Sequence, residues 1–206
     1  MFYQSHDEID SNLRFGDIIS GFPFISFTID DFPETVHNFN LNFSSKKFYV
    51  VLTPCCSIED GALILSPLEQ ILPKFFDNPY FKEDFTRINR ITLPKYMLPE
   101  MAWSRMKPEE RDEKLSREPE YPFVENYIYS EHELLPKYEL KYKSTVIATT
   151  GYYMINFKRI VQINSKRLNR PVQIPKILQL TIPTREELRK KIVKYYNRVP
   201  QEDIIA

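Results

Sequence analysis

The only two cysteines of the chain stand side by side at the end of an apolar run, where a nucleophile or a metal ligand could sit. The stretch reads VVLTPCCSIEDG and contains Cys55 and Cys56. Structural zinc usually needs spaced ligand pairs, and a disulfide between neighbours is strained, so we expect neither. A catalytic Cys56 would need a base such as His37 or His132. The alternative is that both cysteines simply pack at a strand end.

A long stretch without acids is the second feature that could do chemistry. Residues 140–185 hold nine bases and no Asp or Glu, whereas residues 1–35 hold seven acids and one base. Cations bind phosphates and aromatic side chains stack on bases, as single-stranded nucleic-acid recognition requires. We predict that RNA or DNA is contacted by Lys158, Arg159, Lys166, Arg167 and Arg170. The alternative is that the acidic and basic segments lie side by side and neutralise each other.

Length and composition limit the class of protein. The chain has 206 residues, of which 42% are hydrophobic and 27% charged, so it can bury a core. No apolar run approaches the ~20 residues that cross a bilayer. Two cysteines without an export signal predict a cytoplasmic protein. We expect no membrane partner, no cofactor and no metal.

Runs of β-branched and aromatic residues predict most of the elements that position these candidates. The runs FYVVLT and ALILSPL are typical of buried strands, and the short turn-forming SIEDG between them predicts a hairpin. Near the C-terminus, Thr184 and Glu187 form a capping-box pattern that predicts the start of a helix. Its predicted buried stripe is Leu188, Ile192, Val193, Tyr195, Tyr196 and Val199.

The predicted fold class is α+β, a small bent antiparallel β-barrel or sheet with a helical insertion and a C-terminal helix. We predict a single domain over 1–206. Its β-rich core covers about 14–68 and 123–199, and a charged helical insertion covers about 69–122.

The order of these pieces resembles the MazF/PemK-like toxin family of small bent β-barrels. The matching pieces are GDII (16–19), FYVVLTP (48–54), ALILSPL (62–68), STVIATTGYYMINFKRIVQI (144–163) and TREELRKKIVKYYN (184–197). The resemblance implies a toxin-antitoxin or phage-defence protein that associates with nucleic acid.

The resemblance also indicates where catalytic residues would lie. Members that cut RNA use an Arg before the second strand and a Thr or Ser after the third. Here Lys46 and Lys47 stand at the first position and Glu69 at the second. Lysine lacks the bidentate fork of arginine, so ribonuclease activity does not follow from the motif. The alternatives are a non-catalytic protein-interaction module and a cysteine-dependent hydrolase, and the chain could form a homodimer.

Overall fold

The computed structural model divides the chain into two compact units, which are described separately. Unit 1 comprises Met1–Glu69 and Lys158–Thr181, and unit 2 comprises Gln70–Phe157 and Ile182–Ala206. The structure describes residues 1–21, 23–29, 39–45, 47–58, 62–76, 85–89, 100–116, 124–164 and 175–197. The single domain expected from the sequence stays a prediction.

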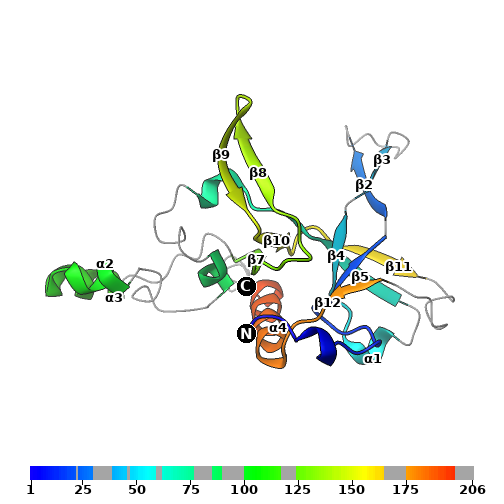
Figure 1. The fold of residues 1–206 in the computed structure, drawn as a ribbon, viewed down its shortest axis with the longest axis horizontal. Helices are drawn as coiled ribbons and strands as arrows, with labels where there is room; N and C mark the ends of the chain where they lie inside the picture. Colours follow the sequence, from blue (N-terminus) through cyan, green and yellow to red (C-terminus); the bar gives the residue numbers. More distant parts are fainter. Residues whose placement is uncertain are drawn as a thin grey trace, which may run out of the picture. The chain divides into compact units, whose positions relative to one another are not determined.

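Unit 1 is built on a five-stranded antiparallel sheet (Figure 1). The strands are β1 (Ile18–Ser20), β4 (Phe48–Val51), β5 (Ala62–Pro67), β11 (Val161–Asn164) and β12 (Lys176–Leu178). Their spatial order is β11-β5-β4-β1-β12. The sheet therefore brings residues near position 160 beside the predicted central hairpin.

The apolar runs of the sequence form the core of this sheet. Ile19, Tyr49, Val51, Leu63 and Leu65 are completely buried and pack together. β4 is buried along its whole length, as its unbroken apolar pattern predicts. A strand buried on one face only would alternate apolar and polar residues. All four residues of β4 are buried, so β4 is covered on both faces.

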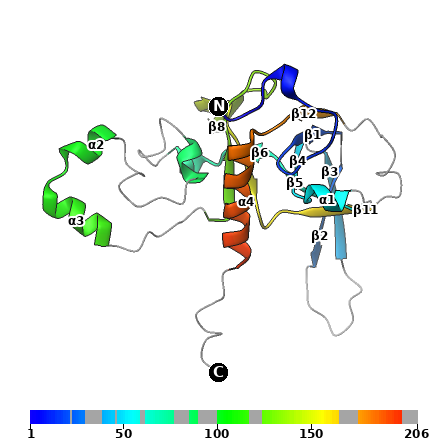
Figure 2. The same ribbon diagram turned by 90° about the horizontal axis from the view of Figure 1, so that it is seen from below.

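The hairpin of β4 and β5 is confirmed, but its connection differs from the predicted tight turn. Val51 pairs with Leu65, and the ten residues 52–61 separate the strands. The short helix α1 (Cys55–Ile58) occupies part of this connection and leads into β5 (Figure 2). Pro54 precedes α1, and its carbonyl accepts a hydrogen bond from the Ser57 N–H at 2.9 Å.

A second hairpin in unit 1 lies before β4, in a stretch of largely polar composition. β2 (Pro23–Ile29) pairs with β3 (Phe39–Ser45), with Ile29 opposite Phe39. The alternation in FNLNF, with an apolar residue at every second position, is the strand signal that the polar composition hid.

Unit 2 contains a three-stranded sheet in the order β6-β10-β7. Its strands are β6 (Glu69–Gln70), of which only Gln70 belongs to unit 2, β10 (Tyr153–Asn156) and β7 (Asn126–Tyr129). Within its described residues, the helical insertion predicted over about 69–122 contains β6, the short 3-10 helices η2 (Pro73–Phe75) and η3 (Phe85–Asn89), and the α-helices α2 (Glu100–Arg105) and α3 (Pro108–Ser116).

Residue Asn89 fastens η3 to the sheet of unit 2. Its side-chain amide donates to the Ile128 carbonyl and accepts from the Ile128 N–H, both at 2.6 Å. Ile71, Phe75, Phe85, Ile88 and Met154 complete the buried cluster around Ile128. The Asn89 amide therefore makes the two backbone hydrogen bonds that a neighbouring strand would make to this residue of β7.

The C-terminal helix α4 (Ile182–Tyr196) confirms the predicted helix and corrects its details. It begins two residues before the predicted cap at Thr184, with a proline in its first turn, where the missing N–H costs nothing. Its buried residues are Thr184, Arg185, Leu188 and Lys191. Val193 and Tyr196, predicted to face the core, are half exposed.

Lysine 191 explains why the buried face of α4 differs from the apolar stripe. Its ammonium donates a hydrogen bond to the Ile88 carbonyl and lies 6.0 Å from the centre of the Tyr127 ring. Burial lowers the pKa of Lys191 to about 7, although the charge of Glu187 opposes this effect. A hydrogen bond at the tip lets a long charged side chain replace an apolar residue.

The remaining hairpin of unit 2 consists of β8 (Tyr138–Tyr142) and β9 (Thr145–Thr150). Lys143 and Ser144 connect them, both with positive φ, at 45° and 68°. Two left-handed residues in a two-residue connection form the type I′ turn that matches the twist of paired strands. The hairpin forms its own two-stranded sheet (Figure 1).

These elements establish an α+β fold with mostly antiparallel sheets. Among the residues that the structure describes, no helix has both the length and the apolarity to cross a bilayer.

Candidate nucleic-acid interface

Three cations of unit 1 stand in chain segments at the same end of its sheet. Tyr49 pairs with Pro67, and the Leu68 N–H donates to the Phe48 carbonyl at 3.0 Å. Lys47 directly precedes β4, at the end of the sheet where β5 ends. On the other side of β5, Lys158 and Arg159 directly precede β11, which pairs with β5. We call Lys47, Lys158 and Arg159 the cationic corner.

An ion pair and a backbone contact hold Arg159 in the cationic corner. Its guanidinium binds the carboxylate of Glu69, and the Ser66 hydroxyl donates to the Arg159 carbonyl at 3.0 Å. The Glu69 side chain is 17% exposed, whereas that of Arg159 is 51% exposed. Because a guanidinium carries five N–H donors, Arg159 keeps donors facing solvent while its position is fixed.

The two lysines of the corner are solvent-exposed. Lys47 directly precedes β4, with its ammonium 5.2 Å from the centre of the Phe48 ring, and Lys158 follows the last residue of unit 2 along the chain. Three cations with one carboxylate give the corner a net charge of about +2, and surface charges of one sign attract phosphate at low ionic strength. The corner can therefore bind an anionic backbone.

The other predicted basic residues do not join this corner within the described structure. Lys166, Arg167 and Arg170 lie outside the described residues. Arg185 is buried in α4. The Lys176 side chain, another base of the acid-free segment, is buried in unit 1, so the segment does not form one exposed basic surface.

Lysine 176 instead confirms, at one point, that the acidic N-terminal segment neutralises the basic one. Its ammonium lies 2.9 Å from Asp17 and 3.4 Å from Asp10. Burial tends to raise the pKa of Asp10, but hydrogen bonds and charges from Arg14 and Lys176 outweigh it and lower the pKa. These contacts fix β12 against the chain that enters β1.

The predicted catalytic candidates do not form a catalytic set among the described residues. Lys46 lies outside the described residues, and Lys47 belongs to the cationic corner. Cys56 lies within α1, beside Cys55, but the structure does not describe its side chain. His37, one of its proposed bases, is likewise not described.

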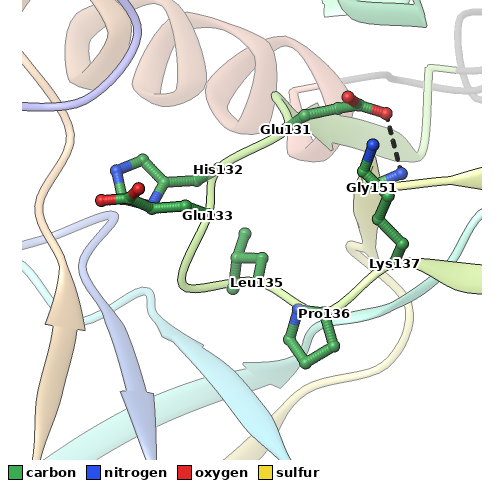
Figure 3. Close-up of a pocket in the computed structure, with 7 residues that line it drawn as sticks. All are labelled: Glu131, His132, Glu133, Leu135, Pro136, Lys137 and Gly151. Atoms are coloured by element: carbon green, nitrogen blue, oxygen red, sulfur yellow. Dashed lines mark hydrogen bonds between the residues drawn. The ribbon is translucent and has the colours of Figure 1, made fainter.

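The other proposed base, His132, lies in unit 2 and lines a surface pocket of about 360 Å³. The pocket is formed by Glu131, His132, Glu133, Leu135, Pro136, Lys137 and Gly151 (Figure 3). The Nδ1 atom of His132 accepts the Leu134 N–H at 3.2 Å. Glu131 is turned toward Gly151 and accepts its N–H at 2.8 Å, while His132 and Glu133 lie on the opposite side of the loop.

This pocket does not supply the hydroxyl or thiol that a serine- or cysteine-type nucleophile requires. Its lining, as far as the structure describes it, contains no serine, threonine, tyrosine or cysteine side chain, so it offers a base without a hydroxyl or thiol nucleophile. Within the described ranges, no three His, Cys, Asp or Glu side chains are placed to hold a metal ion. The pocket is therefore a weaker candidate site than the cationic corner.

Comparisons with known proteins do not connect this geometry with a known site. Neither a protein-family model, nor a curated protein, nor a solved structure matches the chain. The resemblance to the MazF/PemK-like family stays a prediction.

The contact between Glu69 and Arg159 was missed by sequence reasoning. The two residues are 90 positions apart, and the pattern of neither segment indicates the other. Only the antiparallel pairing of β11 with β5 brings them together.

Proposed function

We propose that the protein binds single-stranded RNA or DNA through the cationic corner. The observation that carries this proposal is that Lys47, Lys158 and Arg159, from distant parts of the sequence, stand in segments at the same end of the sheet, where the largely buried carboxylate of Glu69 holds Arg159. An arginine fixed by an ion pair loses little side-chain entropy when it binds a phosphate, because its rotamer is already selected. Two exposed lysines beside it can contact neighbouring phosphates.

The biological setting that we propose is toxin or phage defence in the cytoplasm. We base this setting on the resemblance to the MazF/PemK-like family. From the same resemblance we propose a small bent barrel as the finer description of the fold. The five-stranded antiparallel sheet of unit 1 is consistent with that proposal. Glu69 at the family's hydroxyl position is engaged by Arg159, so we propose binding and no cleavage step.

A fluorescence anisotropy titration of the full chain tests the proposal. The probe is a labelled single-stranded oligouridylate at low salt, with the matching DNA and a duplex as comparisons. The double variant Lys158→Ala with Arg159→Ala should raise Kd about tenfold or more, because each hydrogen bond to a charged group contributes on the order of 1.5–3 kcal/mol. No binding of any probe at low salt would refute the proposal.

A matched control separates local contacts from overall charge. Lys190 and Lys194 are exposed on α4, and changing both to alanine removes the same two charges. This variant should bind the oligonucleotides nearly as the unmodified chain does. Equal losses in the two double variants would mean that the cationic corner has no special role.

A protein-interaction module is the second candidate function. The exposed apolar side chains of the β8–β9 hairpin favour it, with Tyr142 62% and Ile147 53% exposed. The two functions can coexist, because they use different residues.

A further inference from the structure

The β8–β9 hairpin has two open strand edges. It forms a sheet of two strands, and no third strand among the described residues pairs with either. Each open edge presents backbone N–H and C=O groups that a further strand can bind. A two-stranded hairpin alone is only marginally stable in water, so an added strand would stabilise it.

The two edges differ in their side chains. β8 carries Glu139 and Lys141, which form an exposed ion pair at 3.3 Å. β9 reads TVIATT and carries no charge at all. Natural proteins protect open edges with charged residues or proline, and β9 has neither. The β9 edge is therefore the one suited to pairing.

Apolar side chains are exposed along the same strand. Val146 is 46% exposed, and Ile147 is the extra residue of a bulge, because Leu140 pairs with Ala148 while Lys141 pairs with Val146. A bulge redirects the side chain of the inserted residue. Here the redirected side chain is that of Ile147, which is large, apolar and half exposed. It therefore offers a partner an apolar contact.

Charge along the hairpin indicates that the partner is a second copy of this chain. The tip carries Lys143, beside Lys141 in its ion pair with Glu139, whereas the loop at its base carries two acids, Glu131 and Glu133, and one base, Lys137. Glu131 is held next to the end of β9 by the Gly151 N–H. If two β9 strands pair antiparallel, each basic tip lies beside the acidic base of the other copy, and the uncharged strands meet between them.

We infer that the protein forms a symmetric homodimer in which the β9 strands of two copies pair antiparallel. The result is a four-stranded sheet in the order β8, β9, partner β9, partner β8. Such an isologous contact is closed, because each copy uses the same edge once. The inference uses no residue of the cationic corner and does not depend on nucleic-acid binding.

Sedimentation equilibrium of the full chain over a range of concentrations tests this inference. The unmodified chain should show a monomer–dimer equilibrium. Ile147→Glu should raise the dimer Kd about tenfold or more, since it places two like charges in the centre of the contact. The matched control is Val193→Glu, because Val193 is 50% exposed on α4, outside the hairpin. That control should dimerise normally.

A mixing experiment tests the antiparallel arrangement itself. Lys143→Glu and Glu131→Lys should each weaken the homodimer, because each places like charges at both ends of the contact. An equimolar mixture of the two variants should dimerise again, since every acid then faces a base. A chain that is monomeric at all concentrations, a dimer insensitive to Ile147→Glu, or a mixture that stays dissociated would overturn the inference. Circular dichroism of each variant identifies any that fails to fold, and Val146→Glu on the same strand, where Val146 is 46% exposed, is then used in place of Ile147→Glu.

Discussion

Replacing Lys191 by methionine should remove a specific pH dependence from the stability of unit 2. The ammonium is buried beneath α4, where burial lowers its pKa from 10.5 to about 7. A base with a lower pKa in the folded state binds fewer protons when folded than when unfolded. Between pH 7 and 10.5 the unfolded chain therefore holds the extra proton, and stability rises with pH across this window.

The size of the effect follows from the two pKa values. Each pKa unit corresponds to about 1.4 kcal/mol, so the full window corresponds to at most on the order of 5 kcal/mol. Methionine is isosteric enough to fill the site but leaves the Ile88 carbonyl without its donor, at a cost of about 1–3 kcal/mol. Lys191→Met should therefore stabilise the protein near pH 6 and destabilise it above pH 10.

Urea unfolding monitored by circular dichroism at pH values from 6 to 11 measures this difference. Subtracting the curve of the variant from that of the unmodified chain cancels the tyrosines and other groups that titrate in the same range. The difference in unfolding free energy should change by several kcal/mol between pH 7 and 10.5, as linkage requires. A difference that is constant across the window would refute the buried charge.

Three further perturbations test other parts of the structure. Lys176→Met should destabilise unit 1 by about 3–5 kcal/mol in urea unfolding, because it removes the ammonium that compensates the charge of the fully buried Asp17; an effect no larger than that of an exposed lysine changed to methionine would contradict the ion pair. Asn89→Ala should cost about 2–4 kcal/mol, because both backbone groups of Ile128 lose their partners, and equal hydrogen-exchange rates at Ile128 would contradict this. Cys56→Ser should leave oligonucleotide binding unchanged, and a large rise in Kd would place the thiol in the binding site.

Several elements could be predicted because the relevant signal is local. The runs FYVV and ALILSP are rich in apolar residues, and both form strands that pair as a buried hairpin. The C-terminal helix follows from its periodicity and charge pattern, and its existence is confirmed. Average composition misleads at β3, where the asparagines give a loop-like composition although apolar residues alternate as in a strand.

The buried face of α4 could not be predicted from periodicity alone. Lys191 is buried because the Ile88 carbonyl, 103 residues away in sequence, accepts a hydrogen bond from its Nζ atom, and no local pattern contains that acceptor. The same applies to the candidate site. Lys158 and Arg159 were selected from the acid-free segment, but the partners that place them at a corner with Lys47 come from the pairing of β5 with two other strands.

The salt dependence of oligonucleotide binding tests the central claim most directly. Removing one lysine or arginine that binds a phosphate should reduce the slope of log K against log salt by about 0.7 for a single strand. The double variant Lys158→Ala with Arg159→Ala should therefore show a slope smaller by about 1.4 than the unmodified chain, while the paired substitutions at Lys190 and Lys194 leave the slope unchanged. Identical slopes for all three proteins would contradict binding at the cationic corner.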